Sequence, residues 1–150
     1  AWYASSPPDY PPARDKFEGA TVTEKELQRT YANLRHANEL GVTLTIGSDS
    51  FSFVTPYGYV TIDEMYDFVD KAGVTILDTI KAATLNGAKM VHKENEFGSV
   101  EKGKLADLLV VKGDVANNIH DLKPDNMEFI LKEGDPVVRM TNGVKVTNAF

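Results

Sequence analysis

In the first half of the chain, apolar residues recur first at the spacing of a helix and then at that of a strand. Residues 24–40 carry five apolar positions three or four residues apart, which would form one helix face. They are Leu27, Tyr31, Leu34, Ala37 and Leu40. Thr23 and Glu26 have the spacing of a capping box, and Gly41 can adopt the left-handed conformation that ends a helix. The branched residues of 42–46 then predict a short buried strand.

Two further helices are predicted after this strand. Thr61 and Glu64 repeat the capping-box spacing, so we expect a helix over 62–72 that ends at Gly73. The next run of apolar positions predicts a third helix over 76–90. An amphipathic helix that leads into a strand, followed by more helices, is typical of an α/β protein.

The last third of the chain changes to short branched runs that are typical of strands. We expect strands over 106–112, 127–132 and 137–146. Asn142 and Gly143 predict a two-residue hairpin turn, because a type I′ turn requires positive φ at both central positions.

The first twenty residues differ from both patterns. They hold four of the seven prolines, which excludes helix interiors and central strands, so we expect an irregular arm. Its aromatic residues indicate that the arm packs on another surface. They are Trp2, Tyr3, Tyr10 and Phe17.

The amino-acid composition limits which binding partners and which cellular compartment are expected for this protein. A hydrophobic content of 42% is enough for a packed core, and the net charge of −6 argues against nucleic acid and anionic membranes as partners. No cysteine is present, so disulfides, thiolate metal sites and a cysteine nucleophile are excluded. No stretch resembles a membrane span or a signal peptide. We therefore expect a cytoplasmic location.

A carboxylate, Asp49, stands directly after the strand predicted over 42–46. By itself it is either a ligand and base in an active site or a loop residue that caps the next element. The flanking Ser48 and Ser50 fit turn residues, since no histidine is placed by the sequence to activate a serine nucleophile. The aromatic residues that follow can line a substrate pocket or pack in a core. They are Phe51, Phe53 and Tyr57.

Other charged positions are interpreted as structural. Asp63 and Glu64 fit charges at a helix N-terminus and receive no catalytic role. Asp107 follows a turn into a strand, and we expect it to accept a hydrogen bond from backbone. The three histidines are interpreted as surface or packing residues. They are His36, His92 and His120.

Three segments, in this order, resemble the C-terminal end of metal-dependent amidohydrolases. They are "GVTLTIGSDS", "AGVTILDTIKAATLNGAKMV" and "FGSVEKGKLADLLVVKGD", at residues 41–50, 72–91 and 97–114. Their order and separations make the resemblance specific. It is nearest to the imidazolonepropionase and dipeptidase-like branch, whose members also continue past the aspartate with a loop similar to "TPYG" at 55–58.

The resemblance implies a fold and a domain division. Such enzymes have a (β/α)₈ barrel with a small β-sandwich, and barrel strands carry catalytic groups at their C-terminal tips. Residues 1–91 would then be the last part of the barrel, with 42–46 as its final strand. Residues 92–150 would contribute strands to the sandwich.

The resemblance also implies a role for Asp49. In the family, the aspartate at this place contacts a divalent metal, expected to be zinc, and takes a proton from the metal-bound water. The implied reaction is hydrolysis of a C–N bond in a small molecule, either a cyclic amide or a dipeptide-like amide.

The family's remaining metal ligands are not found in this sequence. It has three histidines and no His-x-His pair, whereas a catalytic zinc site uses three protein ligands. We therefore expect a C-terminal fragment of such an enzyme, inactive alone, which contacts the remainder of its own polypeptide or a second chain. Two alternatives stay open: a non-catalytic binding or assembly protein that reuses the barrel end, and a small α+β domain whose motif matches are accidental.

Overall fold

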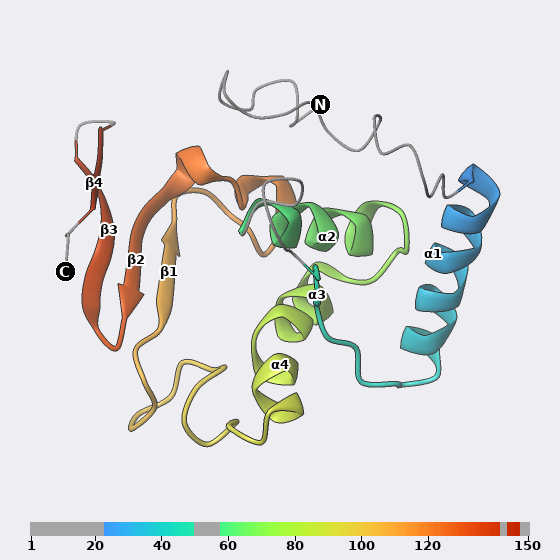
Figure 1. The fold of residues 1–150 in the computed structure, drawn as a ribbon, viewed down its shortest axis with the longest axis horizontal. Helices are drawn as coiled ribbons and strands as arrows, with labels where there is room; N and C mark the ends of the chain where they lie inside the picture. Colours follow the sequence, from blue (N-terminus) through green and yellow to red (C-terminus); the bar gives the residue numbers. More distant parts are fainter. Residues whose placement is uncertain (1–22, 50–57, 142–143, 148–150) are drawn as a thin grey trace.

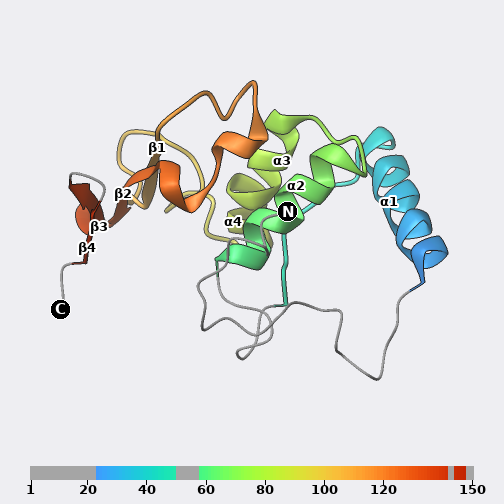
Figure 2. The ribbon, with the colours of Figure 1, turned by 90° about the horizontal axis from the view of Figure 1, so that it is seen from above.

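The computed structural model describes residues 23–49, 58–141 and 144–147. The proline-rich arm, the residues Ser50, Phe51, Phe53 and Tyr57, and the turn residues Asn142 and Gly143 lie outside these ranges. Figures 1 and 2 place three helices between a fourth helix, α1, and an antiparallel sheet. Helices come first in the chain and an antiparallel sheet last, a mix that fits a part of the predicted α/β fold.

The helices follow the apolar periodicity closely, with one interruption. They are α1 (Glu24–Glu39), α2 (Tyr59–Asp70), α3 (Ile76–Ala83) and α4 (Leu85–Met90). The capping box of Thr23 and Glu26 at the start of α1 is confirmed, and Gly41 adopts a φ of 74° after its end. No helix within the described ranges is long and apolar enough to cross a bilayer.

Two details of the helix predictions are wrong. The second helix begins at Tyr59, not after Thr61, because Gly58 takes a φ of 85° and allows the chain to enter the helix earlier. The third predicted helix is two helices, since Thr84 leaves the helical conformation at φ −128° and ψ −89°. The Thr84 hydroxyl donates to the Ile80 carbonyl at 2.7 Å, which satisfies an acceptor at the end of α3.

The strand predicted over 42–46 is also not observed. These residues form no ladder with any strand of the described ranges, and they run as an irregular segment from α1 to the other helices (Figure 1). Their polar backbone groups bind helices instead. The Ile46 amide donates to the Ala82 carbonyl at 3.2 Å, and the Asn86 side chain donates to the Leu44 carbonyl at 2.8 Å. A strand is defined by its pairing, and among the described residues this apolar run has no strand to pair with.

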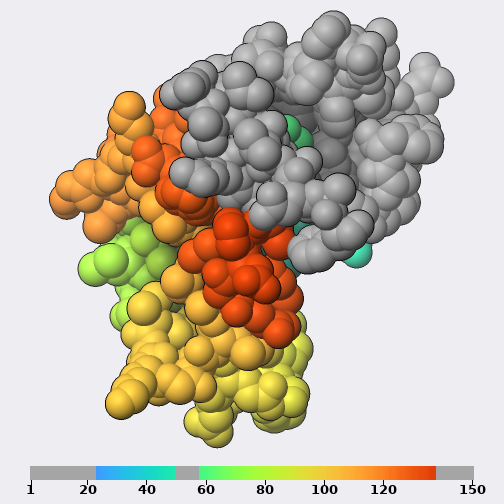
Figure 3. Space-filling model, turned by 90° about the vertical axis from the view of Figure 1, so that its left-hand side faces the viewer, coloured from blue at the N-terminus to red at the C-terminus, as the bar shows by residue number. Residues whose placement is uncertain are grey.

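The sheet confirms the strands predicted in the last third. It is antiparallel in the order β1-β2-β3-β4, and the run predicted over 137–146 forms the paired strands β3 and β4. The bounds are β1 (Leu108–Val111), β2 (Met127–Lys132), β3 (Asp135–Thr141) and β4 (Val144–Thr147). Two short 3₁₀ helices, η3 (Ile119–Asp121) and η4 (Pro124–Asn126), lie in the connection from β1 to β2. Figure 3 views this side of the molecule, with β2 in orange to red beside the yellow to gold loop of residues 92–107.

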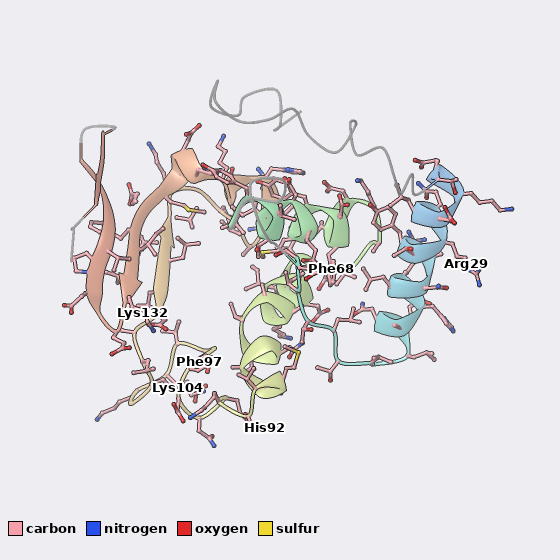
Figure 4. The ribbon with its side chains drawn as sticks, in the orientation of Figure 1. Arg29, Phe68, His92, Phe97, Lys104 and Lys132 are labelled. Carbon is pink, nitrogen blue, oxygen red and sulfur yellow. The ribbon has the colours of Figure 1, made fainter. Side chains whose placement is uncertain are left out.

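Two apolar clusters place α2 at the centre of the described chain. The first contains Phe68, Ala72, Val74 and Ala82, with Tyr31, Leu34, Leu44 and Ile46 packed against it. The second contains Met65, Ile119 and Leu122, with further residues from α2, α3 and β1 around them. Figure 4 shows Phe68 on the side of α2 that faces α3. One helix therefore connects α1 and the segment 42–49 with the sheet region.

Polar contacts attach α1 to the end of α2. Arg35 donates to the carbonyls of Ala72 at 2.8 Å and Lys71 at 3.1 Å. The Tyr31 hydroxyl donates to the Asp67 carboxylate at 2.7 Å. No residue of α1 is fully buried, so these contacts and the apolar face together hold α1 in place.

A pair of glycine substitutions tests the packing of the loop after α4. A Cβ added at Gly98 would lie 2.6 Å from the Ala88 Cβ, and the φ of Gly98 is 95°. We expect Gly98→Ala to lower the free energy of unfolding by about 1–3 kcal/mol from overpacking, with backbone strain in addition. Gly87 lies inside α4, and apart from its chain neighbours and the backbone of its own helix no atom lies within 4 Å of the position that a Cβ would occupy there. Gly87→Ala should therefore raise that free energy by about 0.5–1 kcal/mol. Chemical denaturation measures both, and changes of the same sign would contradict the structure.

Candidate functional site

The residue singled out by the sequence, Asp49, lies at the end of the segment that the helices hold. It is exposed, and its φ is 46°, in the left-handed region. This conformation costs most residues about 1–2 kcal/mol, although aspartate tolerates it better than most. A turn that keeps Asp49 there requires support from its neighbours.

Helix α2 supplies that support through two side chains on one face. The Gly47 amide donates to both carboxylate oxygens of Glu64, at 3.2 Å each. One turn earlier on α2, the Thr61 hydroxyl donates to the Ser48 hydroxyl at 3.4 Å. Positions three apart on a helix lie on the same face. The spacing interpreted as a capping box thus serves to hold the turn before Asp49.

The other side of the segment is fixed by α3 and α4. The bonds from Ile46 to Ala82 and from Asn86 to Leu44 lie immediately before the turn, and Leu44 and Ile46 pack into the core. The backbone that leads to Asp49 is therefore held on both sides, and the carboxylate stands at an exposed end.

The environment of Glu64 changes its acidity. Burial raises the pKa of the Glu64 carboxyl, the Gly47 amide opposes this, and the nearby Asp67 charge adds to the increase. A carboxyl whose pKa is raised in the folded chain contributes stability below its unfolded pKa and loses that contribution as pH rises through the folded value.

This sign gives a test on the chain itself. We expect the free energies of unfolding of Glu64→Gln and of the parent chain to differ least at pH values below the pKa of glutamate in the unfolded chain. As pH rises through the raised pKa, the free energy of unfolding of the parent should fall relative to that of the variant. Urea denaturation across this pH range measures the difference. A difference that shrinks with rising pH would show that the hydrogen bond, and not burial, dominates the Glu64 carboxyl.

The three histidines do not form a metal site with Asp49, and two of them contact other side chains. His36 lies 3.7 Å from Glu39 on α1, and the His120 Nε2 lies 3.1 Å from Asp70 while its ring packs on Tyr66. His92 follows α4 with a φ of 57° (Figure 4). Within the described ranges, no three side chains of the metal-binding types come together. By themselves these residues do not fit a resident metal, and Asp49 can supply one ligand at most.

The structural role predicted for Asp107 is confirmed. Its carboxylate accepts from the Glu133 amide at 2.8 Å and from the Lys132 ammonium at 2.7 Å. The Lys132 contact is the main reason that the pKa of Asp107 is lowered, and the Glu133 amide adds to the effect. Asp107 therefore joins the start of β1 to the turn that follows β2, far along the chain from Asp49.

Comparison with known proteins shows which family the sequence matches. The sequence model of the amidohydrolase family matches residues 6–146. An imidazolonepropionase from Thermoanaerobacter pseudethanolicus is 33% identical over 91 residues, which cover 61% of this chain and 21% of that protein. An imidazolonepropionase from Picrophilus torridus is 31% identical over 131 residues, which cover 86% of this chain and 30% of that protein.

A solved structure shows a similar arrangement of elements. The crystal structure of a Xaa-Pro dipeptidase with methionine bound in its active site superposes with a TM-score of 0.62 at 33% identity. The match covers 71% of this chain and 25% of the dipeptidase chain. In all three comparisons this chain spans less than a third of the other protein's length.

Proposed function

The chain belongs to the amidohydrolase family, and we propose that it forms the end of a hydrolase that presents Asp49 to a C–N bond. The observation that carries the proposal is the exposed Asp49 at the end of a backbone segment held by α2 on one side and by α3 and α4 on the other. A catalytic group must be held close to one geometry, and this arrangement provides it.

We propose that the active unit contains more polypeptide than these 150 residues, from the same chain or a partner. The unit is called the complete hydrolase below. The lengths of the relatives support this proposal. Large apolar side chains that are exposed on the helices and at the start of the segment 42–49 also support it. They are Leu40, Val42, Leu77, Met90 and Val91. In a barrel, the segment 42–46 would have neighbouring strands, which it does not have within the part of the chain that the structure describes.

Amidohydrolases generally depend on divalent metal ions. When bound, a metal such as zinc supplies Lewis acidity that lowers the pKa of water toward neutrality. Asp49 would contribute one carboxylate ligand, and the other ligands would come from the rest of the complete hydrolase.

In the proposed reaction, Asp49 accepts and then returns one proton. As water attacks the carbonyl carbon next to the scissile bond, a C–O bond forms and the Asp49 carboxylate accepts the proton released. The C–N bond then breaks, and the same carboxyl group returns the proton to the leaving nitrogen. A dipeptide-like amide gives a carboxylic acid and an amine, a cyclic amide gives both groups on one opened molecule, and Asp49 is ionised again.

The substrate class is a small cyclic amide or a dipeptide-like amide, in keeping with the activities that the relatives' names give. The test is to assay the complete hydrolase with imidazolone propionate and with an Xaa-Pro dipeptide in the presence of zinc. We expect hydrolysis of one of them. A folded, metal-loaded protein that hydrolyses neither would overturn the substrate assignment and favour a binding or assembly role, to which the exposed apolar side chains would also be suited.

The isolated 150-residue chain should behave differently from the complete hydrolase. We expect no amide hydrolysis and no zinc retained after dialysis, because one carboxylate without histidine partners is a poor zinc site. Elemental analysis of the dialysed chain and an assay with both substrates provide the measurement. One tightly held zinc per chain would show that the ligand set is complete without further polypeptide.

A further inference from the structure

We propose that Glu64 is a positioning residue for Asp49, holding the turn of residues 47–49 through the Gly47 amide so that the carboxylate keeps one direction. This inference rests on the proposed function, since it assigns the residue that orients the proton acceptor. It replaces the expectation that Glu64 is only a charge near a helix N-terminus, because Glu64 lies in the second turn of α2 and binds the turn instead.

Both carboxylate oxygens of Glu64 accept from the same backbone amide, that of Gly47. The distances of 3.2 Å from the Gly47 nitrogen to Oε1 and Oε2 place this amide between the two oxygens. Gly47 lies two residues before Asp49, so the hydrogen bond fixes the backbone directly before the reacting group. Thr61, one turn earlier on α2, makes a longer contact of 3.4 Å from its hydroxyl to the Ser48 hydroxyl.

The helix that carries Glu64 is a rigid support. Its neighbours Ile62, Met65 and Phe68 are buried, at 8%, 6% and 6% exposure. A side chain on such an element holds a geometry more closely than a loop residue does. Glu64 itself is half-buried, whereas Gly47 is exposed, so the hydrogen bond between them lies at the surface of the helix.

The conformation of Asp49 gives this support a purpose. Its φ of 46° lies in the left-handed region, which aspartate tolerates better than most residues but which is still less favourable than the extended or right-handed regions. If the Gly47 bond is lost, the turn can relax and the Asp49 carboxylate moves. A displacement of about 1 Å in a catalytic group can cost about 10²-fold in rate.

Two substitutions separate positioning from proton transfer. A glutamine at position 64 keeps a carbonyl oxygen that can accept from Gly47, whereas alanine removes the acceptor. If Glu64 itself exchanged protons with the substrate, both variants would fail alike. If Glu64 positions the turn, glutamine should restore what alanine loses.

The first measurement needs no substrate. Amide hydrogen exchange of the isotopically labelled 150-residue chain, followed by NMR, reports the protection of Gly47. We expect Glu64→Ala to remove this protection and Glu64→Gln to retain it, with α2 itself still protected. Glu39→Ala is the matched control, an exposed glutamate on α1 that should leave Gly47 unchanged. Equal protection of Gly47 in the parent and in Glu64→Ala would overturn the proposal.

The second measurement is the rate of the complete hydrolase with the better of the two amide substrates. We expect Glu64→Ala to lower kcat by about 10²-fold with little change in KM, and Glu64→Gln to recover most of that loss. If Asp49→Asn is impaired and Glu64→Ala is not, Glu64 has no positioning role and the proposed function stands. If Asp49→Asn keeps the parent rate, the proposed function and this inference both fail.

Discussion

Replacing Phe68 with alanine is expected to lower the free energy of unfolding by about 3–5 kcal/mol. Phe68 is 6% exposed on α2, and its cluster joins α1, the segment 42–49 and α3. The substitution leaves a cavity where these elements meet, and domains are stable by only about 5–15 kcal/mol in total. Urea denaturation followed by circular dichroism measures the change.

A matched control is available one helix away. Leu77 on α3 is 59% exposed, so Leu77→Ala removes a large apolar side chain that is mostly in water already. We expect a change within about 0.5 kcal/mol, as for surface positions in general. If both variants lose similar stability, Phe68 is not the centre of the cluster that supports the candidate site.

Asp49→Asn in the complete hydrolase is expected to lower kcat by about 10²–10⁴-fold while the fold is retained. Asparagine has nearly the shape of aspartate and keeps an oxygen that can act as a weak ligand, but it cannot accept the proton. Steady-state rates with the better amide substrate, together with zinc content and circular dichroism, measure the effect. Equal zinc content in parent and variant would assign the loss to proton transfer.

The control for this variant is an aspartate outside the site. Asp125 is exposed in the short 3₁₀ helix η4, between β1 and β2. Asp125→Asn changes the net charge by the same amount and should leave kcat unchanged. A similar loss in both variants would point to a general effect of charge and not to a role of Asp49.

Local patterns predicted most of the secondary structure because the responsible forces act over a few residues. The apolar spacing of 24–40 and the capping box of Thr23 and Glu26 correspond to α1, since helix and cap both form within one segment. The branched runs of 106–112 and 127–132 likewise correspond to β1 and β2, which pair with each other in the described chain.

The prediction for 42–46 shows where local pattern stops being sufficient. Branched apolar residues are suited both to a strand and to an irregular buried segment, and only a neighbouring strand makes the difference. Here the neighbours are Ala82 and Asn86, whose approach is a property of the tertiary structure. The barrel that would supply a strand partner requires polypeptide beyond the described residues.

The sequence singled out Asp49 as a candidate but not the residues that support its turn. Asp49 stands out because a carboxylate follows an apolar run within a family-like motif, whereas Glu64 has the spacing of an ordinary cap with Thr61. Because Gly58 caps α2, the helix starts earlier than predicted, and Thr61 and Glu64 lie within it instead of at its cap. Their side chains therefore contact the turn of residues 47–49. A glycine directly before the helix was the one available signal, and its effect depends on a φ of 85° that sequence does not determine.

The most direct test of the central claim is chemical rescue of Asp49→Ala by formate in the complete hydrolase. If a carboxylate at this position accepts the proton, the variant should have little amide-hydrolysis activity, and added formate should increase its rate in proportion to concentration. Formate should leave the parent and Asp125→Ala unaffected. An Asp49→Ala variant that hydrolyses the substrate at the parent rate without formate would contradict the claim and leave Asp49 as a residue of the loop.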